Sequence, residues 1–358
     1  MILRAAPRQQ TDGGSREEVM LGIAVLGCGR IGRMHAANIA AHPRARLTAV
    51  YDVSGDAAAE VAAIEGVPVA ASAEEIFASP ETQAVLVATA TETHADYIEA
   101  AVAAGKPILC EKPIDLSLER VERCAAAIAG TTVPVQLGFN RRFDPGHRAA
   151  REAVARGDIG ELHQVIITSR DPGMPPRAYY EMAGGLLRDM TIHDFDLARY
   201  MLGEEPVEVF AVAGRLIDPA LMDELDDHDT AMVVMRTASG RQCHINNSRA
   251  STYGYDQRVE LLGTAGMVRS ENRRPHEMRR YGADTADAAE PYLHFFIERY
   301  REAFMAEIDA FVDSVEQGAP VQVGFEDGRR ALILAEAAYR SLTERRMVRV
   351  DEITNGRG

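Results

Sequence analysis

The stretch LGIAVLGCGRIG, residues 21–32, decides the fold of this 358-residue chain. Its apolar first half is typical of a buried strand, and residues 31–42 have the periodicity of a helix. Glycines fill the turn between the two elements. Gly27 permits a tight turn, Gly29 lets a ligand approach the backbone, and Gly32 lets the helix pack close to the strand. The stretch therefore predicts the first strand–turn–helix unit of a parallel α/β domain.

The next acidic residue along the chain indicates that this glycine turn binds a dinucleotide. The alternative is a glycine turn that binds no ligand. Asp52 ends the second predicted strand (46–52), 20 residues after Gly32, as in dinucleotide-binding domains. Arg30 and Ile31 open the helix, whose N-terminal N–H groups and dipole attract phosphates. Asp52 can accept hydrogen bonds from the ribose 2′-OH of NAD and would repel the 2′-phosphate of NADP. We therefore expect NAD, although Arg30 could assist NADP by reaching past Asp52.

Strands and helices go on alternating as far as residue 140. This order predicts a Rossmann domain over residues 20–140, with a doubly wound parallel sheet covered on both faces. The further predicted strands are 67–70, 84–90, 107–113 and 134–140, and the further predicted helices are 55–65, 73–78, 93–104 and 117–129.

Longer strands follow, and they predict an α+β domain over residues 141–325 with an open, largely antiparallel sheet. Short turns at 238–240 and 263–266 favour hairpins. The acidic run Asp223–Asp229 is interpreted as a solvated loop. The predicted strands are 161–170, 207–217, 230–237, 241–249 and 259–270, and the predicted helices are 185–202, 292–317 and 325–344.

Composition narrows the class of protein. The formal net charge of −15 disfavours a nucleic acid partner, and no apolar run is long enough to cross a membrane. The four cysteines form no CxxC pair, so a reducing, cytoplasmic location is expected rather than a disulfide framework or a thiolate metal site. Residues 1–19 are polar, lack the apolar core of a signal peptide, and are expected to be a disordered extension.

Polar residues follow the strand predicted at 84–90. Thr89, Thr91 and His94 stand at its carboxyl end, the edge where such sheets bind ligands. We expect them to contact the cofactor, although His94 is equally well interpreted as an ordinary residue of a helix N-terminus.

Glu111 and Lys112 end the next predicted strand, at the same edge of the sheet. A lysine there would face the nicotinamide crevice. Its ammonium group can stabilise the alkoxide that develops when a hydroxyl group is oxidised. The alternative is a surface lysine, which is where most lysines lie.

A second polar cluster lies on the helix predicted at 185–202. Asp189 and His193 are four residues apart and would share one helix face, which Asp196 extends. A carboxylate beside an imidazole can tune it as a base for a secondary alcohol. The alternatives are a surface ion pair and a metal site, but no third ligand has a convincing spacing, so no metal is expected.

Together these segments resemble the glucose-fructose oxidoreductase / inositol dehydrogenase (Gfo/Idh/MocA) family over residues 21–350, and most of all its inositol 2-dehydrogenases. The general family motifs are GCGRIGRMHA (27–36), EKP (111–113) and GFNRRFDP (138–145). The narrower, inositol dehydrogenase-like segments are SRDP (169–172), GGLLRDMTIHDFDLARYMLG (184–203) and NSRASTYGYDQRVELLG (247–263).

The resemblance implies roles for residues and an assembly. Lys112 would be the active-site lysine, His193 the proton acceptor and Asp189 its partner. The resemblance also implies a homotetramer formed through the open sheet faces, and a C-terminal helix and strand at 326–350 that return to the nucleotide domain.

Four further residues match family positions near the substrate. Asn140 and Arg141 would lie in the crevice near nicotinamide and substrate, although many relatives have methionine where Asn140 stands. Asp171 and Tyr253 would contact the polyol.

The implied reaction is NAD-dependent oxidation of a cyclic polyol, with myo-inositol giving 2-inosose. Another inositol isomer (scyllo- or D-chiro-inositol) or a glucose-type sugar is the alternative substrate. A dinucleotide-sensing regulator without turnover is the alternative from another class, and the presence of Lys112, Asp189 and His193 together argues against it.

Overall fold

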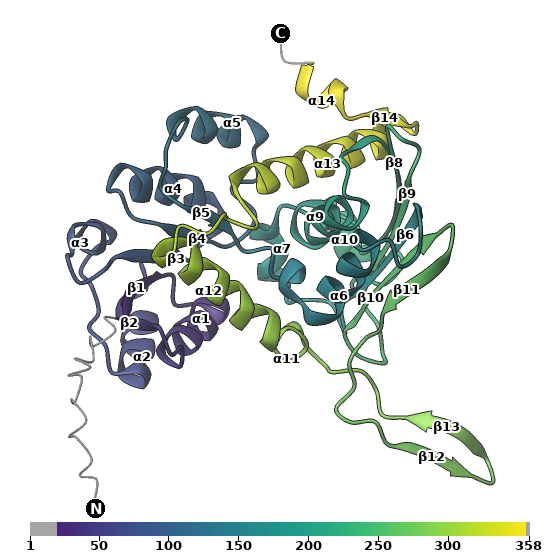
Figure 1. The fold of residues 1–358 in the computed structure, drawn as a ribbon, viewed down its shortest axis with the longest axis horizontal. Helices are drawn as coiled ribbons and strands as arrows, with labels where there is room; N and C mark the ends of the chain where they lie inside the picture. Colours follow the sequence, from purple (N-terminus) through teal and green to yellow (C-terminus); the bar gives the residue numbers. More distant parts are fainter. Residues whose placement is uncertain (1–19, 356–358) are drawn as a thin grey trace, which may run out of the picture.

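The computed structural model describes residues 20–355, so the extension expected at 1–19 lies outside the described residues. Two sheets lie side by side, with helices between them and around the first (Figure 1). The elements of the first part are β1 (Leu21–Leu26), α1 (Arg30–Ala40), β2 (Ala45–Tyr51), α2 (Gly55–Glu65), α3 (Ala73–Ala78), β3 (Ala84–Val87), η1 (Thr91–Thr93), α4 (His94–Ala103), β4 (Ile108–Cys110), α5 (Leu118–Ala127), β5 (Val135–Leu137) and η2 (Asn140–Phe143).

The second part carries the larger sheet. Its elements are α6 (Pro145–Ala155), β6 (Leu162–Arg170), α7 (Arg177–Ala183), α8 (Leu186–Asp189), α9 (Thr191–Leu202), β7 (Pro206–Gly214), α10 (Pro219–Leu225), β8 (Thr230–Thr237), β9 (Gln242–Ser248), β10 (Asp256–Gly263), β11 (Gly266–Ser270), β12 (Arg279–Gly282), β13 (Thr285–Ala289), α11 (Phe296–Arg299), α12 (Arg301–Glu316), α13 (Phe325–Glu344), β14 (Val348–Arg349) and α14 (Asp351–Asn355).

The first sheet is the predicted Rossmann-type sheet. Its five strands are parallel, in the order β2-β1-β3-β4-β5. The run at 67–70 was predicted as a further strand, but it contributes only one bridge, between Val50 and Val69. The order places the ends of β1, β3 and β4 next to one another, so their polar residues meet at one edge.

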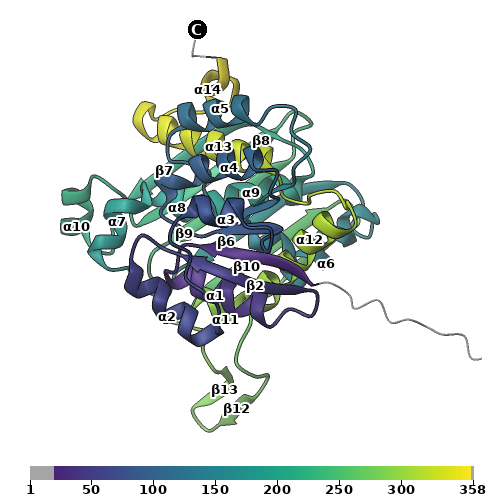
Figure 2. The ribbon, with the colours of Figure 1, turned by 90° about the vertical axis from the view of Figure 1, so that its left-hand side faces the viewer.

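The second sheet has seven strands in the order β11-β10-β6-β9-β8-β7-β14, and every neighbouring pair is antiparallel except β6 and β9. Both predicted hairpin turns are present, joining β8 to β9 and β10 to β11. The α9 and α13 helices pack against one face of this sheet. The small hairpin β12–β13 projects away from both sheets (Figure 2).

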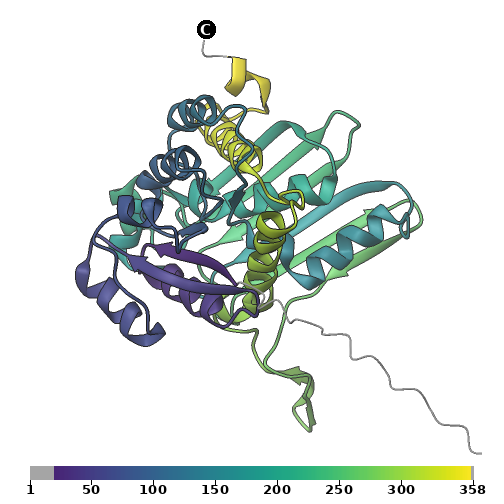
Figure 3. The same cartoon turned by 60° about the vertical axis from the view of Figure 1, so that its left-hand side comes forward.

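Two C-terminal helices lie between the sheets (Figure 3). We expected α12 within the second domain, but its apolar residues divide between two cores. Ile308, Phe311 and Val312 pack with β1, β2 and α1, whereas Ala303, Phe304 and Ala310 belong to the core that also holds residues of the second sheet. The longer helix α13 contacts α5 and β5 on one side and α9 and β7 on the other. Both helices therefore fasten the first sheet to the second.

The acidic run Asp223–Asp229 is only in part the solvated loop that we predicted, since Asp223, Glu224 and Asp226 are exposed. Asp223 lies on α10, while Asp227 and Asp229 are buried. The Asp229 carboxylate accepts hydrogen bonds from the backbone N–H groups of Leu216, Ile217 and Asp218. Because backbone N–H groups donate to these two carboxylates, Asp227 and Asp229 can be buried.

No helix within residues 20–355 has the length and apolar composition needed to span a membrane.

Candidate active site

The glycine turn has the shape that its sequence predicts. Gly27 has φ +94°, and a Cβ atom there would lie 2.4 Å from the carbonyl oxygen of Ala88. A Cβ atom on Gly32 would lie 1.8 Å from the carbonyl oxygen of Gly27. A Cβ atom on Gly29, by contrast, would meet no atom within 4 Å. Chain packing thus requires the first and third glycines, whereas the second faces open space at the start of α1, as a bound pyrophosphate needs.

The Asp52 carboxylate ties β2 to this turn. Its Oδ2 accepts the backbone N–H of Cys28 at 2.6 Å, and its Oδ1 accepts that of Ser54 at 2.7 Å. An ionised carboxylate has about four acceptor positions, so two remain for ribose hydroxyl groups. The guanidinium of Arg30 lies over the ring of Phe295, 5.3 Å from its centroid, and the neighbouring Ile31 is half-buried on α1.

Three predicted cofactor contacts lie after β3. Thr89 and Thr91 are half-buried, and the Thr89 hydroxyl is 2.7 Å from that of Thr93. The buried ring of His94 lies between two carbonyl oxygens, 2.7 Å from Pro113 and 3.1 Å from Thr89. Burial lowers the pKa of His94. His94 therefore connects the segment after β3 to the segment after β4.

Lys112 is not a surface lysine. Its side chain is only 15% exposed, and its Nζ donates to the Asp189 carbonyl oxygen at 3.0 Å and to Asp189 Oδ1 at 3.4 Å. The peptide bond from Lys112 to Pro113 is cis. The neighbouring Glu111 carboxylate turns away from this contact and pairs with His35 Nε2 at 2.8 Å. Lys112 thus joins the edge of the first sheet to Asp189 of the second part.

Asp189 is an ionised acceptor at the centre of the site. Besides Lys112, the hydroxyl of Tyr179 donates to its Oδ1 at 2.7 Å, and the guanidinium of Arg249 donates to its Oδ2 at 2.8 Å. Burial alone would raise the pKa of Asp189, but the charges of Lys112 and Arg249 outweigh burial and lower it. Tyr179 and Arg249 were not predicted. Arg249 lies within the family-like segment 247–263, which could have drawn attention to it, but no spacing links either residue to Asp189.

His193 lies nearby but does not pair with Asp189. The helix breaks at Met190 between α8 and α9, and the backbone N–H of His193 donates to the Met190 carbonyl at 3.3 Å. Among the described residues, His193 Nδ1 is buried without a partner, and the ring packs edge-on against Phe139. Burial, Lys112 and Arg141 hold the pKa of His193 well below its usual value. The imidazole is therefore neutral and can accept a proton.

Asn140 and Arg141 are buried where η2 begins, next to the same helix. The Arg141 guanidinium pairs with Asp194 at 2.5 Å and donates to the Ser169 hydroxyl at 3.2 Å. Its guanidinium carbon also lies 5.9 Å from the centroid of the Tyr300 ring. The charge of Arg141 thus helps to lower the pKa of His193.

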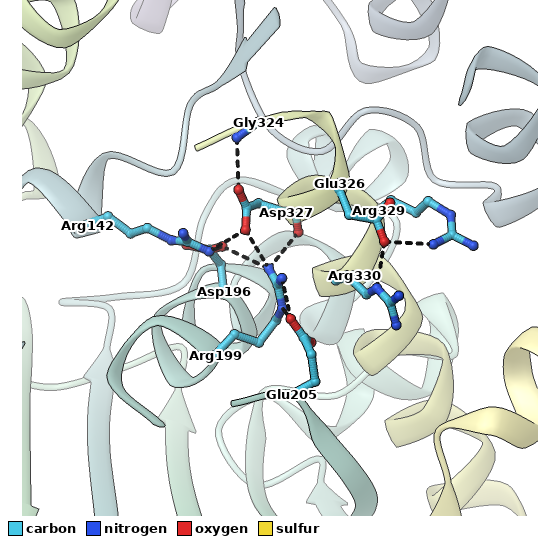
Figure 4. Close-up of polar contacts among 9 residues, drawn as sticks. All are labelled: Arg142, Asp196, Arg199, Glu205, Gly324, Glu326, Asp327, Arg329 and Arg330. Carbon is cyan, nitrogen blue, oxygen red and sulfur yellow. Dashed lines mark hydrogen bonds and ion pairs between the residues drawn. The ribbon is translucent and has the colours of Figure 1, made fainter. Parts of the chain in front are cut away.

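Asp196 serves the junction between the two parts of the chain. It pairs with Arg142, whose guanidinium also reaches Asp327 at the start of α13 (Figure 4). Arg199, one turn along α9, donates to the same Asp327 and to Glu205. This network fixes the helix that carries His193 against α13.

The two predicted polyol contacts lie in different surroundings. Asp171, just after β6, accepts a hydrogen bond from Arg249 at 3.3 Å and so belongs to the Asp189 cluster. The Tyr253 hydroxyl instead contacts Arg170 at 2.7 Å and Asp256 at 2.9 Å, and this tyrosine is 40% exposed.

No group of three His, Cys, Asp or Glu side chains within residues 20–355 is arranged to hold a metal ion.

Comparisons with known proteins match both parts of the chain. Residues 21–139 match the oxidoreductase family with an NAD-binding Rossmann fold, and residues 147–269 match the GFO/IDH/MocA C-terminal domain. The chain is 47% identical to an inositol 2-dehydrogenase of Rhizobium meliloti, with 91% of this chain and 98% of that protein covered. It is 42% identical to a myo-inositol 2-dehydrogenase of Thermotoga maritima, with 92% and 99% covered.

A solved structure is also similar. It is the scyllo-inositol dehydrogenase of Lactobacillus casei with bound NAD(H) and scyllo-inositol, with a TM-score of 0.86, 29% identity, and 93% of this chain and 99% of that chain covered. The two family matches agree with the geometry of the chain. The NAD-binding match covers the glycine turn, Asp52 and Lys112. The chain belongs to the GFO/IDH/MocA family of NAD-binding oxidoreductases.

Proposed function

We propose that this protein is an inositol 2-dehydrogenase that oxidises myo-inositol to 2-inosose with NAD+. The observation that carries the proposal is the contact of Lys112 Nζ with Asp189 at the sheet edge that holds the glycine turn. The charge of Lys112 also lowers the pKa of His193, which supports a neutral imidazole near that pair. A neutral base and a fixed ammonium group are what oxidation of a secondary alcohol requires. The names of the similar proteins support inositol as the substrate.

The residues divide the chemistry between them. When bound, NAD+ accepts the hydride from the carbon that is oxidised. His193 takes the hydroxyl proton, and Lys112 stabilises the negative charge that develops on the oxygen. Asp189 keeps Lys112 in place through its carbonyl and carboxylate oxygens. Asn140, Arg141, Asp171 and Tyr253 remain proposed substrate-side residues; of these, Asp171 lies in the Asp189 cluster.

Cofactor discrimination depends on Asp52 in this proposal. Its carboxylate would accept hydrogen bonds from the ribose hydroxyl groups of NAD and repel the 2′-phosphate of NADP. Thr89, Thr91, Arg30 and Ile31 complete the proposed cofactor contacts, whereas His94 and Glu111 would act by holding the surrounding backbone and side chains.

One assay tests the reaction and the cofactor together. The protein is mixed with NAD+ or NADP+ and with myo-, scyllo- or D-chiro-inositol or glucose, and the absorbance of the reduced cofactor is followed. We expect the highest kcat/KM with NAD+ and myo-inositol. A higher value with another polyol would replace the substrate, and no turnover on any of them would favour a dinucleotide sensor.

We also propose a homotetramer, built on the open face of the second sheet. Apolar side chains are exposed on the face opposite α9 and α13, namely Ile166, Val212, Met232, Val234 and Leu262. Light scattering after size-exclusion chromatography should give four times the chain mass, and Met232→Lys should reduce it. A monomeric wild type would contradict the assembly.

We also propose a cytoplasmic location. The four cysteines are free and buried, which agrees with it.

A further inference from the structure

We propose that Arg249 is a positioning residue that holds Asp171 beside Asp189, so that Asp171 accepts from the hydroxyl group next to the one that is oxidised. The inference rests on the proposed function, because it presumes a polyol at this site. It assigns to one buried guanidinium the preference for a ring with neighbouring hydroxyl groups.

The geometry of the Arg249 side chain is that of a bridge. One terminal nitrogen donates to Asp189 Oδ2 at 2.8 Å and the other to Asp171 Oδ2 at 3.3 Å. The two carboxylates come from separate elements, α8 and the end of β6, so no local structure fixes their spacing. A guanidinium presents its donors in a rigid planar fork, which a lysine ammonium group cannot reproduce.

Burial and backbone hydrogen bonds fix the position of Arg249. Arg249 directly follows β9, its side chain is 3% exposed, and its backbone N–H donates to the Asp229 carbonyl at 2.8 Å. Asp229 is itself fixed by the backbone of the segment before α10. The ring of Tyr180 lies 5.6 Å from the guanidinium carbon. The fork is therefore ordered before any substrate arrives, which lowers the entropy cost of orienting the carboxylates.

The oxygens of the two carboxylates are used differently. Asp189 Oδ1 already accepts from Tyr179 and Lys112, so this carboxylate holds the lysine that would stabilise the reacting oxygen. Among the described residues, Asp171 Oδ1 accepts no hydrogen bond, and the Asp171 side chain is 23% exposed. Asp171 can thus accept from the next hydroxyl group on the ring. The bridge sets the distance between these two acceptors.

The test compares two substrates with matched variants. Arg249→Lys keeps the positive charge but loses the planar fork of guanidinium donors. The matched control is Arg123→Lys, at an exposed position on α5. The substrates are myo-inositol and a deoxyinositol that lacks a hydroxyl group next to the oxidised carbon. We expect Arg249→Lys to lower kcat/KM by about 10- to 100-fold on myo-inositol, as for one lost charge-assisted hydrogen bond. The loss on the deoxyinositol should be several-fold smaller, because the Asp171 contact is absent there and only the Asp189 contact is weakened.

Two outcomes would overturn the inference, and they are distinguishable. If Arg249→Lys lowers kcat/KM equally on both substrates, Arg249 acts through Asp189 alone and does not position Asp171, while the proposed function survives. If the wild type oxidises neither compound, the proposed function fails and this inference fails with it. NADH fluorescence titration should match the wild type for Arg249→Lys, and thermal unfolding should remain a single transition at a lower Tm, because a buried bridge is weakened. Those two measurements separate a lost substrate contact from a misfolded variant.

Discussion

Adding one methyl group at each glycine of the turn should separate chain packing from cofactor binding. In Gly32→Ala the new Cβ atom would lie 1.8 Å from the Gly27 carbonyl oxygen, about 1.7 Å closer than the ~3.5 Å at which heavy atoms attract. The obstacle is backbone, so α1 must move away from β1. In Gly29→Ala the new atom meets no protein atom within 4 Å and enters the space assigned to the pyrophosphate.

The magnitudes follow from these contacts. Overpacking against backbone places Gly32→Ala near the upper end of the usual range, about 3 kcal/mol, which lowers Tm by roughly 6–12 °C. Gly29 is the N-cap of α1 with φ −69°, a conformation that alanine adopts without strain. Its poorer capping and its smaller unfolded-state entropy offset each other, so stability should change by less than about 0.5 kcal/mol. NADH affinity should fall on the order of 10- to 100-fold in both variants.

The assay is thermal unfolding without cofactor, followed by NADH fluorescence titration. Gly282→Ala on the projecting hairpin is the control, since a Cβ atom there also meets nothing within 4 Å. It should change neither Tm nor NADH affinity. The reasoning is refuted if Gly29→Ala binds NADH as tightly as the wild type, because the space above Gly29 would then not hold the cofactor. It is also refuted if Gly32→Ala unfolds at the wild-type temperature.

Three further predictions follow from individual residues. His193→Ala should lower kcat by about 10²–10⁴-fold while NADH affinity is unchanged, and full turnover at neutral pH would exclude His193 as the base. The pKa of His193 lies well below 6.5, so wild-type kcat/KM should stay level as pH falls through 6.5, and a midpoint at or above 6.5 would contradict this. Burial and the Glu111 charge raise the pKa of Glu307 well above 4.5, so this acid favours the folded state less as pH rises above 4.5. Glu307→Gln should therefore raise Tm over the wild type by a margin that grows from pH 5 to pH 9, and a constant margin would exclude this cause.

The regular elements of the nucleotide domain could be predicted from the sequence because each has its own local signal. Helices α2 and α3 have the predicted bounds, since serine caps begin both of them and glycine in the left-handed region ends α2. The strand predicted at 67–70 is absent because apolar character alone does not give a segment a pairing partner. Pairing needs a neighbouring edge with matching direction, which is a tertiary property.

The candidate site could be predicted only where a motif carries it. Gly27, Gly29, Gly32, Asp52 and Lys112 occupy positions that follow from the ends of parallel strands. Tyr179 and Arg249 reach Asp189 from segments 10 and 60 residues away, and no periodicity relates such positions. The same reasoning explains α12, whose sequence gives no indication that its apolar residues divide between two cores.

The relation between Asp189 and His193 shows how one break in a helix changes a prediction. Four-residue spacing places two side chains together only while the helix continues. Here the His193 backbone N–H bonds to Met190, which leaves the Asp189 carbonyl oxygen free to accept from Lys112 Nζ at 3.0 Å. The same break gives Lys112 a second contact, at the Asp189 carboxylate. Asp189 therefore orders the lysine, and the charge of Lys112 helps to keep the half-buried His193 neutral. A base that no carboxylate holds protonated is the form that can remove a proton from an alcohol.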